Sequence, residues 1–272
     1  MRSKTVYHRD VRPKKSIGQH FLKDFSVAER IADLLLSFPD LPVLEIGPGT
    51  GVLTQFLLKN KRNLTVVELD KESVIYLNKH YPELKNRIIE ADFLKLDLNV
   101  LFPCSFCIIG NYPYNISSQI FFKALEYKDK IPCCAGMLQK EMAERIASKP
   151  GKKTYGIISV LLQTWYDIEY LFTVEPEAFD PPPKVKSAVI QIIRNDRTNL
   201  DCDEVLFKTV VKTAFNQRRK TLRNSLKTLL ENDNAIVSLP VFDRRPEQLS
   251  VEEFIGLTCL IEDINYKLKT IN

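Results

Sequence analysis

The sequence predicts an α/β protein: a mostly parallel β-sheet with helices on both faces and an antiparallel last strand, followed by a small domain made only of helices. From residue 43 to residue 138, short apolar runs alternate with segments of helical periodicity, which is the pattern of successive βαβ units. After residue 198 only helical periodicity remains. The 272 residues are 44% hydrophobic and 27% charged, so a large core can form.

The expected elements of the sheet follow in chain order. A helix at 25–36, with Ser26 as its N-cap, comes before the first strand. The expected strands span residues 43–46, 64–69, 87–91, 106–110, 133–138, 168–174 and 188–193. The expected connecting helices span residues 52–59, 71–80 and 117–127. The proline-rich piece at 175–186 is too short for a crossover helix, so the last two strands should be antiparallel to each other.

The C-terminal region shows three helical patterns, at 204–216, 222–230 and 250–263. Ser250 and Glu253 have the spacing of a capping box at the start of the third one. We therefore expect a separate helical domain at 199–272.

Several classes of protein find no support in the sequence. No run approaches the roughly 18 apolar residues that a membrane span needs, and the N-terminus lacks the apolar core of a signal peptide. The six cysteines form no paired framework, and the C-x-x-C spacing of Cys104 and Cys107 has no second pair of ligands. We expect reduced thiols, no bound metal and a cytoplasmic protein, although the basic N-terminus leaves an organellar transit peptide as an alternative.

A glycine turn lies between the first strand and the next helical segment. Gly47 and Gly49 permit backbone angles closed to other residues, and their missing side chains let a ligand approach the main chain. Val52 stands where a dinucleotide fingerprint would have its third glycine. The pattern E-x-G-x-G, starting at Glu45, suggests a nucleoside ligand without a pyrophosphate, and S-adenosylmethionine is the obvious candidate. A purely structural strand-to-helix turn is the alternative.

Acidic residues follow the second and third strands. In doubly wound sheets ligands bind beyond the carboxyl ends of the strands. Glu68 lies 21 positions after Gly47, an offset at which a carboxylate can accept hydrogen bonds from ribose hydroxyls. Asp92 could accept from an adenine amine. Each acid alone is more often a solvated strand end, but their order along successive strands favours a nucleoside site.

The segment Gly110 to Asn115 carries the sharpest local signal. An adenine amine is a poor nucleophile because its lone pair is delocalised into the ring. The side-chain oxygen of Asn111 and the carbonyl of Tyr112 could accept both amine hydrogens and hold the nitrogen toward tetrahedral geometry. Tyr114 offers a flat face to the base. An asparagine-proline turn after a strand is the alternative interpretation.

A second aromatic residue, Phe179, precedes three prolines that stiffen the backbone. Base chemistry on RNA requires the nucleotide to be extruded and stacked between flat groups. We expect Phe179 and Tyr114 to form that sandwich, and the alternative is that Phe179 is an ordinary core residue.

The C-terminal region carries a basic run from Lys208 to Lys227, with seven basic residues and no acid. Its basic residues recur at helical spacing opposite apolar ones, which predicts a single charged helix face. A helix face that is merely exposed to solvent is the alternative interpretation. The absence of acidic residues from the run favours a surface that contacts phosphates. The expected RNA-binding residues are Lys184, Arg218, Arg219, Lys220 and Arg223.

Together these motifs resemble those of the small-subunit ribosomal RNA adenine dimethyltransferases of the KsgA type, over nearly the whole chain. The segments that carry the resemblance are Gly18 to Leu22, Glu45 to Thr54, Val67 to Asp70, Asn111 to Tyr114, Phe179 to Val185 and Phe215 to Leu222. Generic methyltransferases share only the glycine turn. The family usually has leucine where Tyr112 stands and asparagine where His20 stands.

The resemblance implies a Rossmann-like class I methyltransferase fold. It also implies dimethylation of two adjacent adenosines near the 3′ end of small-subunit rRNA, late in subunit assembly, with S-adenosylmethionine as methyl donor. The residues that would line the cofactor site are His20, Leu22, Gly47, Glu68, Asp92 and Asn111. The implied domains are a basic segment at 1–24 capping that site, a methyltransferase domain at 25–198 and an rRNA-binding domain at 199–272. We expect a monomer that binds no membrane.

Two alternatives remain on the sequence alone. The large-subunit rRNA dimethyltransferases that confer macrolide resistance share the asparagine motif. A non-catalytic assembly or transcription factor on the same fold is the second alternative.

Overall fold

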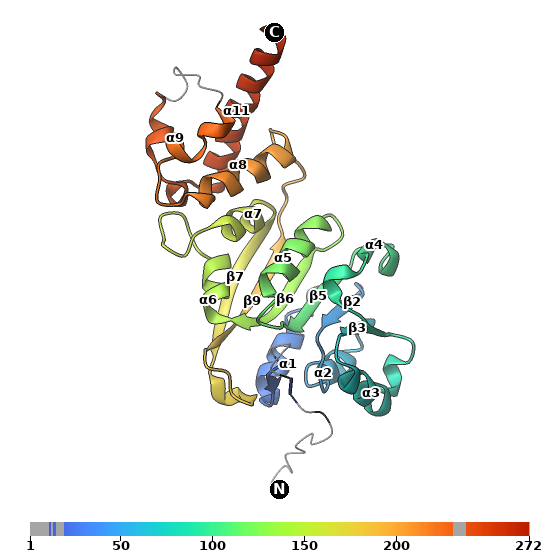
Figure 1. The fold of residues 1–272 in the computed structure, drawn as a ribbon. Coiled ribbons are helices and arrows are strands. Elements are labelled where there is room, and N and C mark those ends of the chain that lie inside the picture. Colours follow the sequence, from blue (N-terminus) through green and yellow to red (C-terminus); the bar gives the residue numbers. More distant parts are fainter. Residues whose placement is uncertain (1–10, 12, 15–18, 231–237, 272) are drawn as a thin grey trace. The chain divides into compact units, whose positions relative to one another are not determined.

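The computed structural model describes residues 11, 13–14, 19–230 and 238–271 (Figure 1). Most of the expected N-terminal segment at 1–24, including Gly18 of its motif, lies outside these residues. The chain divides into two compact units: residues 1–143 with 168–194, and residues 144–167 with 195–272. Residues 144–167 thus group with the C-terminal helices, whereas the sequence had suggested one uninterrupted boundary near residue 198. No helix in the described part of the chain has the length and apolar character to cross a membrane.

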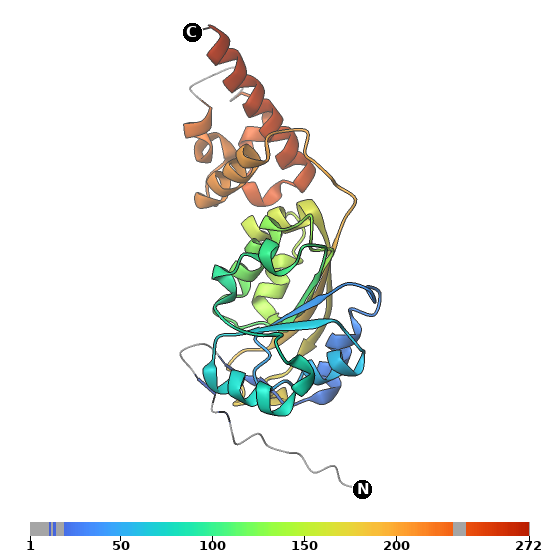
Figure 2. The ribbon, with the colours of Figure 1, turned by 90° about the vertical axis from the view of Figure 1, so that its right-hand side faces the viewer.

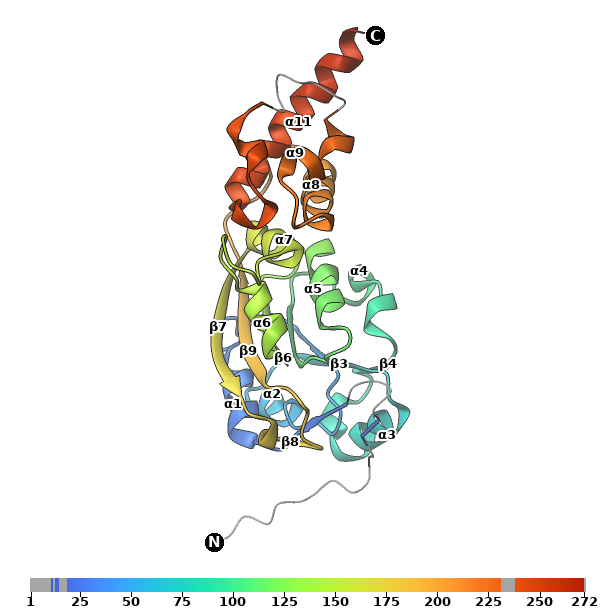
Figure 3. The same cartoon turned by 60° about the vertical axis from the view of Figure 1, so that its left-hand side comes forward.

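The first unit is built on a seven-stranded sheet in the order β4-β3-β2-β5-β6-β9-β7. The strands are β2 (Val43–Ile46), β3 (Leu64–Glu68), β4 (Ile88–Glu90), β5 (Cys107–Asn111), β6 (Cys133–Gln139), β7 (Tyr166–Val174) and β9 (Ser187–Arg194). The pairs from β4 to β6 are parallel, and β9 is antiparallel to β6. Figures 1 and 3 show β7 and β9 side by side and running in opposite directions. The predicted mostly parallel sheet with an antiparallel last strand is therefore confirmed.

Helices cover both faces of this sheet, with α1 and α5 on opposite faces in Figure 2. The helices that lie wholly within the unit are α1 (Phe25–Asp33), α2 (Thr54–Lys59), α3 (Lys71–His80), α4 (Leu98–Leu101) and α5 (Ser117–Glu126). A short pair formed by β1 (Phe21–Leu22) and β8 (Phe179–Asp180) joins two segments distant in sequence. It places the segment before α1 beside the connection between β7 and β9.

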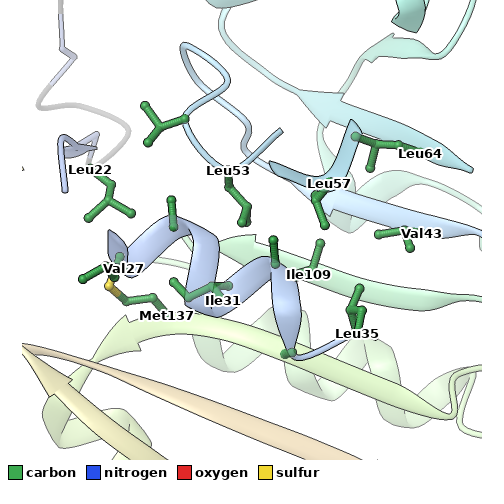
Figure 4. Close-up of a cluster of buried hydrophobic side chains, with 14 of the residues drawn as sticks. Leu22, Val27, Ile31, Leu35, Val43, Leu53, Leu57, Leu64, Ile109 and Met137 are labelled. Atoms are coloured by element: carbon green, nitrogen blue, oxygen red, sulfur yellow. The ribbon is translucent and has the colours of Figure 1, made fainter. Parts of the chain in front are cut away.

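Helix α1 begins two residues earlier than its predicted cap implied. Asp24 is the N-cap, and its Oδ1 accepts hydrogen bonds from the backbone N–H groups of Ser26 and Val27 at 2.9 and 3.3 Å. The assignment of Ser26 as the cap was therefore wrong, because the aspartate is a competing cap of equal propensity. Figure 4 shows Ile31 of α1, and Leu35 shortly after the helix ends, packed on side chains from the sheet. This cluster packs the helix against strands of the sheet.

The second unit is helical. It contains α7 (Ile157–Trp165), α8 (Glu204–Asn216), α9 (Leu222–Ser225) and α11 (Val251–Ile271), and α7 contacts α8 and α11. The capping box is confirmed: the Ser250 N–H donates to Glu253 Oε2 at 2.8 Å, and the Glu253 N–H donates to Ser250 Oγ at 3.2 Å. The helix expected at 222–230 is shorter, because it ends at Ser225 and gives way to a 3-10 turn at Lys227–Leu229.

Candidate functional site

A cavity of about 200 Å³ lies at the carboxyl ends of β2, β3, β4 and β5. The residues that line it come from four consecutive strand ends and from the segment that includes β1. Seven predicted site residues meet there: His20, Leu22, Gly47, Glu68, Asp92, Asn111 and Tyr114. For the residues that follow β2, β3, β4 and β5 the reason is topological, since the carboxyl ends of parallel strands share one edge of a sheet. His20 and Leu22 reach the cavity from the segment that includes β1.

The glycine turn requires its glycines. Gly47 and Gly49 have φ angles of +66° and +56°, in the left-handed region that side chains rarely adopt. A Cβ atom on Gly49 would also lie 2.9 Å from Cε1 of Phe21. The turn is therefore a bare stretch of main chain at the cavity wall, which a ligand can approach closely.

Glu68 fixes this turn with its carboxylate. Its Oε2 accepts from the Gly49 N–H at 3.0 Å, and its Oε1 accepts from the N–H groups of Leu69 and Asp70, both at 2.9 Å. Burial raises the pKa of Glu68, and the three N–H donors oppose that shift. A carboxylate has about four acceptor positions, so one remains for a ribose hydroxyl in the cavity.

Asp92 is the N-cap of a 3-10 turn, Phe93–Lys95, and its Oδ1 accepts from the Leu94 N–H at 3.0 Å. Lys123, which the sequence analysis missed, holds this turn through hydrogen bonds. The Nζ of Lys123 donates to the carbonyls of Leu94 and Leu96 at 2.9 and 2.5 Å, and the residue is only 8% exposed. A lysine within a helical pattern reads as a solvated face, so no sequence signal distinguished it.

Asn111 lies at the end of β5, with its side chain tied to the N-terminal segment. Its Nδ2 donates to the backbone carbonyl of His20 at 3.2 Å. The next residue, Tyr112, is buried: its N–H donates to the Met137 carbonyl at 2.8 Å, and its hydroxyl donates to the Ala135 carbonyl at 2.7 Å. The backbone on which the predicted amine acceptors stand is therefore anchored to β6.

Tyr114 lines the cavity with its hydroxyl 2.5 Å from Ser187 Oγ. Its ring stacks on the imidazole of His20, with a centroid distance of 5.6 Å and an interplanar angle of 26°. The Nδ1 of His20 lies 2.9 Å from the carbonyl of Pro181. The neighbour of the Tyr114 ring is thus His20, which the sequence analysis had placed in the cofactor site only.

Phe179 is not placed as the sequence analysis expected. It is fully buried in the hydrophobic core with Leu22, Val27 and Ile31, and it does not line the cavity. The antiparallel pairing of β1 and β8 sets Phe179 opposite Leu22, so its side chain turns into the core. The expected sandwich of Tyr114 and Phe179 is corrected accordingly, and the alternative of a core residue holds in this structure.

A buried carboxyl group lines the cavity beside the glycine turn. Glu45 is 1% exposed, and its Oε2 accepts from the Thr54 hydroxyl at 2.7 Å. Burial raises the pKa of Glu45 to about 8, the Thr54 hydrogen bond opposes this, and the nearby Glu68 adds to it. The sequence analysis named Glu45 only as part of the turn motif, yet an acid within an apolar strand was a usable signal.

None of the predicted RNA-binding residues is among those that line this cavity. Lys184 is exposed in the first unit. In the second unit, Arg218 Nε lies 3.8 Å from Glu247 Oε2, and Arg223 Nη2 lies 2.6 Å from Asp243 Oδ1. The sequence run has no acids, but the fold brings acids to it from other segments.

Arg219 and Lys220 are exposed, and neither makes an ion pair with a described residue. They lie between α8, which ends at Asn216, and α9, which begins at Leu222, so the predicted single helix face is interrupted. Within the described ranges, no group of three or more histidine, cysteine, aspartate or glutamate side chains could hold a metal ion.

Comparison with known proteins shows the family of the chain. The family model described as "Ribosomal RNA adenine dimethylase" matches residues 11–253. The "Ribosomal RNA small subunit methyltransferase A" of Parabacteroides distasonis is 70% identical over 252 residues, which cover 93% of this chain and 95% of that protein. The protein of the same name from Phocaeicola vulgatus is 62% identical over 253 residues, which cover 93% of this chain and 90% of that protein.

Among solved structures, a dimethyladenosine transferase from Plasmodium falciparum has the same fold, with a TM-score of 0.70 at 24% identity. That match covers 89% of this chain and 97% of the other. The family model spans most of the chain, and both relatives match this chain over nearly their whole length. On these grounds the chain belongs to the ribosomal RNA adenine dimethylase family.

Proposed function

We propose that this protein dimethylates the N6 amines of two adjacent adenosines in a hairpin near the 3′ end of small-subunit (16S) rRNA, with S-adenosylmethionine as methyl donor. Membership of the adenine dimethylase family supports the reaction, and the names of the 70% and 62% identical relatives support the small subunit. The single observation that carries the proposal is the meeting of Glu68, Asp92 and Asn111 around one cavity with the bare glycine turn.

The cavity residues fit the cofactor. Gly47 presents main chain without a side chain, Glu68 has an acceptor position left for ribose hydroxyls, and Asp92 can accept from the adenine amine. His20 and Leu22 line the same cavity from the N-terminal segment. When bound, the cofactor supplies an electrophilic methyl group on a sulfonium, and no metal is needed for that chemistry.

Asn111 and Tyr112 act on the target amine. The Nδ2 of Asn111 is engaged with His20, so its Oδ1 is the atom available to accept an amine hydrogen. The backbone carbonyl of Tyr112 accepts the second hydrogen, and two acceptors hold the nitrogen lone pair toward the methyl group. The protein thus catalyses the reaction by positioning and electrostatics, and no side chain has to act as a strong base.

Tyr114 contacts the extruded base with its ring. Ser187 holds the phenol, which fixes the ring plane at the mouth of the site. The buried Phe179 has no part in this step as the chain is folded here. Stacking of the base on Tyr114 requires the imidazole of His20 to give way or to serve as the opposite face.

The rest of the chain is assigned to RNA contact. We assign the segment 1–24 to capping the cofactor site, 25–198 to methyl transfer and 199–272 to rRNA binding through Arg218, Arg219, Lys220 and Arg223, with Lys184 contributing from the first unit. The enzyme acts as a monomer in the cytoplasm on rRNA within an assembling small subunit.

A methyl-incorporation assay tests the proposal. Purified protein with labelled S-adenosylmethionine is given undermethylated small subunits in one reaction and naked large-subunit rRNA in another. Label in adjacent adenosines of the small-subunit rRNA is the expected result. Label only in the large-subunit rRNA would assign the chain to the macrolide-resistance type, and label in neither would favour a non-catalytic assembly factor.

A further inference from the structure

A second cavity in the first unit, of about 610 Å³, is lined by basic side chains. We call it the basic concavity: its charged walls are Lys59, Lys61, Arg62 and Arg87. Glu83 is the only carboxylate among the described residues that line it. Lys59 is neutralised by an ion pair with Glu29 at 2.7 Å, and Lys61 and Arg87 are the exposed cations of the lining without such a partner among the described residues.

Arg62 is a buried residue of this wall, and hydrogen bonds fix its side chain. It is only 7% exposed, and its Nη2 donates to the backbone carbonyls of Phe38 and Leu41, the latter at 3.1 Å. Its Nε is buried and has no hydrogen-bond partner within the described part of the chain. The guanidinium is thus held on one edge by backbone carbonyls, and no carboxylate among the described residues pairs with it.

Lys61 and Arg87 are held at the mouth of the cavity by the chain itself. Lys61 has a φ of +53°, in the turn that follows α2. Arg87, which precedes β4, donates from Nη1 to Asn63 Oδ1 at 2.7 Å. An uncharged partner fixes the guanidinium without neutralising it, and neither cation makes an ion pair with another described residue.

Two helices end beside the basic concavity, which offers a simpler reason for cations there. Helix C-termini carry partial negative charge, and Lys59 and His80 occupy the last turns of α2 and α3. Lys61 and Arg62 directly follow the end of α2, where their backbone N–H groups donate to the Leu58 and Leu57 carbonyls, but the exposed Arg87 lies outside both helices. A cation beyond those at the helix ends points to an external anion.

We infer that the basic concavity binds phosphate groups of the RNA backbone, as a contact surface additional to the helical unit. This inference rests on the proposed function, which supplies RNA as the substrate. Guanidinium groups fit phosphate oxygens, and phosphate contacts position an RNA without reading its sequence. Tyr81 is shared by the two sites: it lines the concavity, and its hydroxyl donates to the Gly51 carbonyl in the glycine turn at 2.9 Å. Lys61 and Arg62 precede β3 and Arg87 precedes β4, so the concavity lies at the amino ends of these strands, whereas the first cavity lies at their carboxyl ends.

The test uses the full chain with two substitutions, Lys61→Asn and Arg87→Gln. Asparagine tolerates the left-handed backbone at Lys61, and glutamine can keep a hydrogen bond to Asn63. The control carries Lys71→Asn and Lys128→Gln, which remove two charges of the same unit outside the concavity. RNA affinity for small-subunit rRNA is measured from low to high salt, together with cofactor affinity and thermal melting.

We expect the concavity variant to bind RNA about tenfold more weakly than the control at low salt. The slope of log affinity against log salt should be shallower by about 1.4 to 1.8, for two lost phosphate contacts. Cofactor affinity should not change. Equal RNA affinity and slope in both variants, with lower thermal stability in the concavity variant, would overturn the inference in favour of helix-end charges.

A measurement with inorganic phosphate tests whether the concavity binds a small free anion instead of the phosphates of RNA. If it raises the melting temperature of the wild type but not of the concavity variant, while both bind RNA alike, the site takes a small anion and the RNA inference fails. Methyl incorporation by the wild type is measured in the same preparations. If the wild type methylates RNA and the two variants bind RNA equally well, only this inference is refuted. If the wild type does not methylate RNA, the proposed function is refuted.

Discussion

The side-chain amide of Asn111 donates a hydrogen bond to the backbone carbonyl of His20 over 3.2 Å. This contact joins the end of β5 to the N-terminal segment, which is 91 residues away in sequence. Because an amide nitrogen only donates, the contact also orients the Asn111 oxygen for a second partner. The same hydrogen bond therefore joins two residues of the cavity wall and sets the geometry of the proposed amine acceptor.

Replacement of Asn111 tests this arrangement. Asn111→Ala removes the amine acceptor and the bond to His20, so we expect methylation to fall by about 10³-fold, as for loss of one electrostatic stabiliser. RNA affinity should stay within about twofold, since the proposed phosphate contacts are elsewhere. Filter binding and single-turnover methylation measure the two effects. Activity near that of the wild type would remove Asn111 from the mechanism.

Phe179→Leu distinguishes a core residue from a stacking residue. In the core, the substitution changes shape at nearly constant apolar character and should cost about 1–1.5 kcal/mol of unfolding free energy. Methylation per folded molecule should then change little. The matched variant Tyr114→Leu should behave in the opposite way, with a large loss of methylation. Lost activity with unchanged stability for Phe179→Leu would revive the sandwich that the sequence suggested.

The sequence predicts the sheet well because each strand is an apolar run bounded by turn residues, and the helix at Lys71–His80 was placed at its observed bounds. The site residues at strand ends follow from topology alone. Helix α7 was missed: seven of its nine residues are buried, and its sequence has neither a charged residue nor a side-chain N-cap that would mark a helix. The positions of the Phe179 and Lys123 side chains depend on tertiary contacts that the sequence does not show. The pairing of β8 with β1 sets the position of Phe179, and two backbone carbonyls distant in sequence set that of Lys123.

Lys123 is expected to act on cofactor binding through the Asp92 turn. Lys123→Met keeps the apolar stem but leaves the Leu94 and Leu96 carbonyls without a donor, at a cost of about 1–3 kcal/mol each. We expect the cofactor KM to rise about tenfold with a smaller change in kcat. The control is Lys130→Met, which removes a similar bond, to the Phe102 carbonyl at 3.2 Å. Equal effects of the two variants on KM would show that Lys123 is only structural.

Glu45 should make stability depend on pH between about 4.5 and 8. Its pKa is raised by folding, so in this window the folded protein binds a proton that the unfolded chain releases. Stability contributed by the group is thus fully present below pH 4.5 and is lost as pH rises toward 8. Glu45→Gln, which cannot titrate, should flatten this part of the profile. Denaturant unfolding at several pH values measures the slope, and parallel slopes for both proteins would contradict the assignment.

Arg219 and Lys220 should dominate RNA contact in the helical unit, because Arg218 and Arg223 already have acidic partners. The double variant Arg219→Gln/Lys220→Gln should weaken RNA binding and reduce the salt slope by about 1.4 to 1.8. Its thermal stability should stay near that of the wild type. The matched variant Arg218→Gln/Arg223→Gln breaks two ion pairs, so it should lower stability slightly and change the slope less. An equal loss of slope in both variants would mean that RNA displaces Glu247 and Asp243 from their arginines.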